Sequence, residues 1–140
     1  MRPASLRLPG KGNPMTLRTE ELKERLNSNP DFSASSLFFD GIILIEICSL
    51  AIWMKVFMGR AILVTQKPLP FGYTFAVKGT AEGWGLAMDE RKDRLREAVY
   101  KGKLRIEGNT LEFTRMTKAV HGLMKVLREM VTEGLITIED

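Results

Sequence analysis

Residues 101–109 read Lys-Gly-Lys-Leu-Arg-Ile-Glu-Gly-Asn and set the order of three predicted elements. Gly102 is placed to end a preceding helix, because glycine readily adopts the left-handed conformation that follows many helix ends. Charged and apolar residues then alternate, so Leu104 and Ile106 face the same side of a short strand. Gly108-Asn109 turns the chain once more. The stretch therefore predicts a helix, a strand over residues 103–107 and a second helix in quick succession.

The helix expected after this turn is the clearest element of the sequence. Its apolar residues recur at steps of three and four, which is the spacing of one helix face. Gly134 is a natural stop. Methionines contribute to the stripe, and their flexible side chains fill irregular gaps or adapt to varied apolar ligands, so the pattern fits both a filled core and a cavity. The stripe consists of Phe113, Met116, Val120, Leu123, Met124, Leu127, Met130 and Val131.

Upstream, runs of aromatic and β-branched residues predict strands over residues 38–47, 52–57, 61–65 and 73–78. Connections this short favour antiparallel pairing, since parallel neighbours need a crossover of a dozen or more residues. In the last of these strands, alternation places Tyr73, Phe75 and Val77 on one face. Helices are expected over residues 16–27, after a capping Thr80, and over residues 89–101. The pattern is that of one α+β domain over residues 15–140.

The charge of the chain is concentrated at its beginning. The net charge is +4 over 140 residues, and Arg2, Arg7 and Lys11 stand in the first fourteen without an acid. Met1–Pro14 also holds three prolines and two glycines, so we expect a disordered N-terminal extension. From Met15 onward acids and bases nearly balance. A basic face for nucleic acid is therefore not expected.

Groups suited to catalysis are few. His121 is the only histidine and lies at the edge of the apolar stripe, while Cys48 is the only cysteine and lies in an apolar run, where an inert thiol is expected. Converging metal ligands and a glycine-rich phosphate loop are missing from the pattern. Residues 42–54 form the longest apolar run, too short for the roughly 20 residues of a membrane span. The sequence predicts a protein without catalytic residues, metal or cofactor.

The stretch from Gly102 to Asn109 is similar to a segment of the sterol-carrier-protein-2 (SCP-2) family, G-K-[LM]-[KR]-[IV]-x-G-[ND], in which a last strand turns into the final helix. Residues 73–84, Tyr-Thr-Phe-Ala-Val-Lys-Gly-Thr-Ala-Glu-Gly-Trp, resemble the family's last long strand followed by an acidic residue and an aromatic on a short helix. Asn29-Pro30-Asp31-Phe32 resembles bacterial and archaeal members. The similarity in order covers about residues 16 to 130.

This resemblance implies a five-stranded, mainly antiparallel sheet covered by helices, a long C-terminal helix, and an apolar tunnel between sheet and helices. Family members bind sterols, fatty acids, acyl-CoA or other lipids, so the resemblance implies non-enzymatic binding or transfer of such a ligand. The C-terminal residues 137–140 do not form a peroxisomal signal, which favours a cytoplasmic protein of prokaryotic type. The candidate tunnel walls are Phe75, Trp84, Leu104, Ile106, Phe113, Met116, Val120 and Met124.

A second hypothesis needs no ligand. The chain would be an interaction module or accessory subunit with a filled core, and its last helix would face a partner or a second copy, because exposed apolar faces mark interfaces. The sequence leaves a homodimer open.

Overall fold

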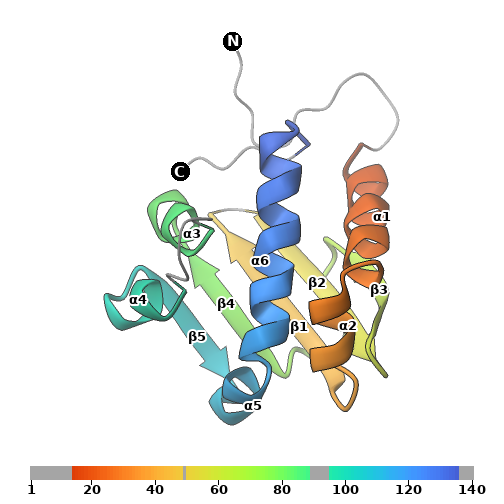
Figure 1. The fold of residues 1–140 in the computed structure, drawn as a ribbon, viewed down its shortest axis with the longest axis horizontal. Coiled ribbons are helices and arrows are strands. Elements are labelled where there is room, and N and C mark those ends of the chain that lie inside the picture. The colour runs from red at the N-terminus through yellow and green to blue at the C-terminus, as the bar shows by residue number, and fades with distance from the viewer. Residues whose placement is uncertain (1–13, 49, 89–94, 136–140) are drawn as a thin grey trace.

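The computed structural model describes residues 14–48, 50–88 and 95–135. Five strands form one mixed sheet in the order β3-β2-β1-β4-β5, and the described helices lie over one of its two faces (Figure 1). The strands are β1 (Asp40–Ile47), β2 (Leu50–Phe57), β3 (Arg60–Thr65), β4 (Phe75–Gly79) and β5 (Leu104–Gly108). The helices are α1 (Pro14–Asn27), α2 (Pro30–Ser35), α3 (Ala81–Ala87), α4 (Leu95–Tyr100), α5 (Thr110–Arg115) and α6 (Thr117–Thr132).

Pairing in the sheet is mainly antiparallel, as predicted. β1 pairs with β2, β2 with β3, and β4 with β5 in antiparallel register. The exception is β4, which lies parallel to β1 with Ile43 opposite Phe75 and Ile45 opposite Val77. The β2–β3 hairpin and residues 66–74 separate these two strands in sequence and supply the crossover that a parallel pair requires.

Side chains of β4 alternate between the two faces of the sheet as predicted, but Tyr73 does not lie on the predicted face. Phe75 and Val77 are fully buried under the helices, as expected. Tyr73 precedes β4 and lies on the opposite face, where its ring centroid is 6.0 Å from that of Trp53. The prediction that Tyr73 shares a face with Phe75 is therefore wrong, because the chain is not yet in a regular strand at residue 73.

Two helices differ from the sequence-based expectation. The connection after Asn27 contains a further helix, α2, which begins with Pro30 and is capped by the Asn29 side chain accepting from the Phe32 amide at 2.8 Å. The last helix is divided at Met116, which ends α5 and begins α6. The Thr117 hydroxyl donates to the Phe113 and Thr114 carbonyls, and such bonds from threonine bend helices.

The ends of α4 and α6 follow the predicted glycines. Gly102 has φ +76°, and the Lys103 amide donates to the Ala98 carbonyl at 2.9 Å. Gly134 has φ +82°, and the Leu135 amide donates to the Met130 carbonyl at 2.9 Å. In both cases a hydrogen bond spans six residues around a glycine in the left-handed conformation. This arrangement gives a carbonyl of the last helical turn a hydrogen-bond donor. The predicted helix over 89–101 is seen only as α4, since residues 89–94 lie outside the described chain, as do residues 1–13 of the predicted extension.

The core lies between the helix-covered face of the sheet and α6. Phe75 in β4 makes edge-to-face contacts with Phe39 and Phe113, at centroid distances of 6.0 and 5.6 Å. α6 packs on α1 and α2, and α1 packs along β3. The Asn27 side chain bonds both the amide and the carbonyl of Ala61, so the C-terminus of α1 occupies part of the sheet's β3 edge.

Candidate ligand-binding site

A cavity of about 430 Å³ lies where α4, α5 and the first turn of α6 meet. Its volume falls within the range of roughly 300–1,000 Å³ that small-molecule sites occupy. α4 contributes one wall, and α5 with the start of α6 contributes the other. The lining residues are Leu95, Arg96, Val99, Tyr100, Phe113, Thr114, Thr117 and His121.

Local sequence features set these walls in place. Gly102 ends α4 and returns the chain into β5, which carries it to the opposite end of the sheet. There the Asn109 side chain caps α5 by accepting from the Glu112 amide at 3.0 Å. The break at Met116 changes the helix course between Phe113 and His121. The cavity therefore lies beside the strand-to-helix unit that residues 101–109 build.

The cavity is apolar inside and polar at its rim. Leu95 is buried, and the Phe113 ring stands between the cavity and the core ring of Phe75. Arg96, Tyr100 and Thr114 are exposed to solvent, so the cavity opens on that side. An apolar chain inside it would lose contact with water while a polar end stayed at the rim.

The eight residues predicted from the family resemblance all belong to, or pack against, one apolar cluster. Phe75, Trp84, Leu104, Met116, Val120 and Met124 are buried, whereas Ile106 and Phe113 are partly buried. Phe113 lines the cavity described above. The assignment of all eight to a ligand-contacting wall remains a prediction.

Sequence reasoning missed most of the cavity lining. Leu95 and Val99 belong to the apolar stripe of α4 that the sequence shows, but such a stripe does not indicate whether the helix packs on the core or lines a cavity. The sequence pattern places His121 at the edge of the apolar stripe of α6, and in the structure this residue is half-buried and lines the cavity. The proximity of α4 to α5 depends on how β5 and its two flanking turns place the helices in space, which periodicity does not encode.

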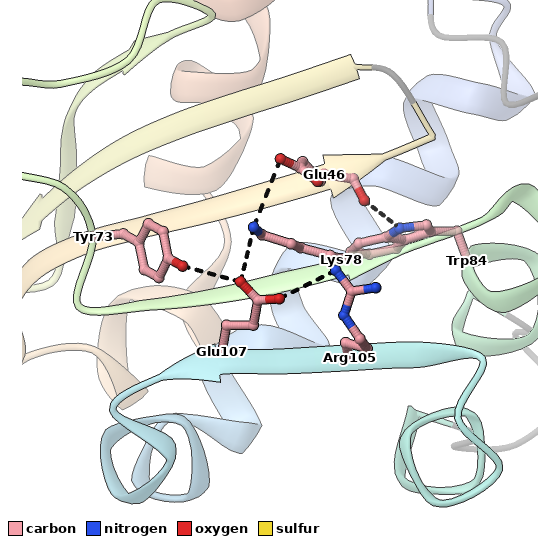
Figure 2. Close-up of polar contacts among 6 residues, drawn as sticks. All are labelled: Glu46, Tyr73, Lys78, Trp84, Arg105 and Glu107. Carbon is pink, nitrogen blue, oxygen red and sulfur yellow. Dashed lines mark hydrogen bonds and ion pairs between the residues drawn. The ribbon is translucent and has the colours of Figure 1, made fainter.

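A second group of polar side chains lies on the sheet face opposite the helices (Figure 2). Glu107 in β5 accepts hydrogen bonds from the Tyr73 hydroxyl at 3.1 Å and from Arg105 at 3.1 Å, and forms an ion pair with Lys78 Nζ at 2.9 Å. Lys78 also lies 4.0 Å from a carboxylate oxygen of Glu46. Nearby, the buried Trp84 Nε1 donates to the Glu46 carbonyl at 2.8 Å and ties α3 to β1.

The ionisation of this group is that of a structural ion pair. The hydrogen bond to Glu107 raises the pKa of Lys78, with a smaller contribution from the charge of Glu46. Hydrogen bonds from Lys78 and then Tyr73 lower the pKa of Glu107. Both shifts move the pKa values away from neutral pH, whereas a general acid or base needs a pKa near the working pH. The pair is suited to joining β4 and β5 rather than to transferring protons.

Within residues 14–48, 50–88 and 95–135, histidine, cysteine and acidic side chains do not gather into a group of three or more able to hold a metal ion. Among the described helices, none combines the length and apolar character needed to cross a membrane. Cys48 is half-buried in the turn after β1, where its φ is +58°.

Solved structures give the comparison that decides the fold. A crystal structure of sterol carrier protein 2 superposes with a TM-score of 0.66 at 14% identity, covering 81% of this chain and 95% of that one. The chain has the sterol-carrier-protein-2 fold. A conserved hypothetical protein from Thermus thermophilus with a suggested sterol-carrier assignment has the same SCP-2 fold, at a TM-score of 0.62 and 15% identity over 90% of this chain and 94% of that one.

A third structure with the SCP-2 fold is the ubiquinone synthesis protein UbiJ-SCP2, with a TM-score of 0.56 and 17% identity over 79% of this chain and 97% of that one. No protein-family model matches the sequence. No curated protein matches it at a significant level. The predicted α+β fold with a five-stranded, mainly antiparallel sheet and a long C-terminal helix is thus confirmed, and the likeness at these identities concerns the fold alone.

Proposed function

We propose that this chain binds an apolar ligand, such as a fatty acid or the acyl chain of a lipid, in the cavity between α4, α5 and α6, and that it does so without catalysing a reaction. The single observation that carries the proposal is an apolar-walled cavity of about 430 Å³ with a polar rim, in a chain with the SCP-2 fold. The sterol-carrier names of its structural neighbours support the same ligand class.

The energetic basis of binding is burial of apolar surface. Each methylene group removed from water contributes about 0.8 kcal/mol, which corresponds to roughly fourfold in affinity. Leu95, Val99 and Phe113 supply the apolar contact surface, and Arg96 at the rim can stay in water while its stem lies along the ligand. A ligand with an acyl chain meets these conditions without a buried polar partner.

Displacement of a fluorescent fatty acid tests the proposal. Val99→Glu introduces a carboxylate into the apolar lining, where desolvation of the charge weakens binding of an acyl chain by about tenfold or more. Val131→Glu is the matched control, because Val131 is also a partly buried valine on a helix and is not among the cavity-lining residues. The proposal fails if the wild-type protein binds no fluorescent fatty acid at micromolar concentration, or if both variants bind it as the wild type does.

The non-enzymatic part of the proposal has its own readout. After prolonged incubation with a fatty acid or an acyl ester, mass spectrometry of the extracted ligand is expected to recover it unaltered. Conversion that disappears in His121→Ala would contradict this part, since His121 is the one cavity-lining residue with an imidazole.

A further inference from the structure

The two edges of the sheet differ in how their backbone groups are covered. At the β3 edge the Asn27 side chain bonds both the amide and the carbonyl of Ala61. At the other edge β5 pairs with β4 alone among the described residues. Figure 1 shows β5 at the outer side of the sheet, with α4 near its start and α5 near its end. An uncovered edge strand offers unpaired backbone groups to a further strand.

The hydrogen-bond pattern between β4 and β5 shows which backbone groups face outward. The Asn109 amide donates to the Thr74 carbonyl at 2.7 Å and continues the β4–β5 register. Because bonded and non-bonded pairs alternate along an antiparallel ladder, Leu104 and Ile106 turn their amide and carbonyl groups away from β4. In agreement, the carbonyl of Gly79, which lies opposite Leu104, accepts from the turn after β1 at 2.9 Å. Within the described chain, the outward groups of Leu104 and Ile106 have no hydrogen-bond partner.

The side chains that flank Ile106 on β5 carry opposite charges. Arg105 and Glu107 lie on the sheet face opposite the helices and form an ion pair at 3.1 Å (Figure 2). The Arg105 side chain is 66% exposed, so it can also reach an acid on a neighbouring strand. Ile106 itself is half-buried and packs against the core. The edge thus presents one positive and one negative side chain, separated by the outward backbone groups of Ile106.

These charges distinguish between the ways in which a second copy of β5 could pair with the first. Outward backbone groups must meet outward groups, so the two-fold axis of a symmetric antiparallel pair lies at one residue, which then faces itself. An axis at Arg105 or at Glu107 places like charges directly opposite each other, which destabilises a pair of strands. An axis at Ile106 places Arg105 of each copy opposite Glu107 of the other. The opposite charges then occupy non-bonded positions, where the side chains of paired strands come closest.

We propose that two copies of this chain join through their β5 edges, with Ile106 at the two-fold axis, so that the two sheets become one. Apolar side chains near both ends of β5 support this contact: Tyr100, the last residue of α4, is 89% exposed, and Leu111 in the first turn of α5 is 59% exposed. Antiparallel pairing brings the end of α4 in one copy near the start of α5 in the other, which removes apolar surface from water. The proposal needs no ligand in the cavity.

Sedimentation equilibrium of the full chain tests this association. A single pair of edge strands forms a small interface, so the wild type is expected to be a monomer at micromolar and a dimer at millimolar concentration. Arg105→Glu places two acids opposite each other on both sides of the axis and should raise the dissociation constant by about tenfold or more. Arg105→Lys keeps the charge and should stay within about threefold of the wild type.

Lys55→Glu is the matched control. Lys55 forms an ion pair with Asp40 at 3.3 Å, as Arg105 does with Glu107, but its strand β2 is separated from β5 by β1 and β4. The variant makes the same change of charge as Arg105→Glu and should leave the dissociation constant within about threefold of the wild type. Thermal unfolding at micromolar concentration checks that all three variants are folded.

Amide hydrogen exchange of the wild type tests the strand pairing without a variant. The Ile106 amide should exchange about tenfold or more slowly at millimolar than at micromolar concentration, because it gains a carbonyl partner, whereas the Gly59 amide in the β2–β3 turn should not change. A chain that stays monomeric at millimolar concentration, or an Ile106 amide whose exchange does not slow, would overturn the proposal. A dimer that Arg105→Glu leaves intact would also overturn it, and loss of that dimer in Lys55→Glu would place the contact on the sheet face instead.

Discussion

Two glycines flank the buried Trp84 in α3, and their surroundings differ. A Cβ atom at Gly83 would lie 2.1 Å from the Lys103 carbonyl oxygen, whereas one at Gly85 would have no atom within 4 Å. Gly83 therefore permits α3 to approach the start of β5, and the close packing lets the Trp84 indole reach the Glu46 carbonyl. Gly85 has no such packing role and carries only the conformational cost of glycine in a helix.

Alanine at these two positions is expected to act in opposite directions. Gly83→Ala should lower the free energy of unfolding by about 2 kcal/mol, because a backbone atom must move. Gly85→Ala should raise it by up to about 1 kcal/mol through helix propensity. Urea unfolding of both variants measures the difference, and equal effects would show that α3 does not pack on β5 as described.

At the scale of elements, the charged group on the second sheet face joins three strands. Lys78 in β4 lies between Glu46 in β1 and Glu107 in β5. Hydrogen bonds from Lys78 and Tyr73 lower the pKa of Glu107. The ionised form of Glu107 is therefore more stable in the folded protein than in the unfolded chain. The contribution of Glu107 to stability is therefore present above the unfolded pKa of about 4.3 and is lost as pH falls through the lower folded pKa.

Glu107→Gln tests this linkage. The variant is expected to melt below the wild type at pH 7, and the difference should shrink as the pH falls from about 4.3 toward 3, since the wild-type carboxylate becomes protonated. Thermal unfolding across this range measures both proteins. A difference that stays constant down to pH 3, or a variant that is the more stable at pH 7, would contradict the assignment.

The elements differ in how well the sequence predicts them. All five strands and the glycine ends of α4 and α6 follow from local patterns, because alternation and helix termination are properties of adjacent residues. The sequence-based prediction lacks α2 although its signal is present: the Asn29 side chain caps α2, and Pro30 is its first residue. The break at Met116 was also missed, since the apolar stripe continues across it and only the threonine back-bonds mark it.

At the scale of the whole molecule, the fold could be predicted but the cavity could not. The segment at 101–109 places a helix, a strand and another helix in order, and the structure confirms that order. Val99 in α4 and His121 in α6 are twenty-two positions apart, and they line the same space in the folded chain. Sequence spacing alone does not say which helices share a cavity. The residues predicted for the site therefore lie mainly on the apolar stripe of the last helix and in the sheet.

The location of a bound acyl chain tests the proposed ligand site most directly. Nuclear magnetic resonance titration of the isotope-labelled chain with dodecanoate should shift the signals of α4, α5 and the first turn of α6, with Leu95 and Val99 methyl groups among the largest. Signals of the sheet face that carries Lys78 and Glu107 should stay in place. An unchanged spectrum at saturating ligand, or shifts confined to that opposite face, would contradict binding of an acyl chain in this cavity.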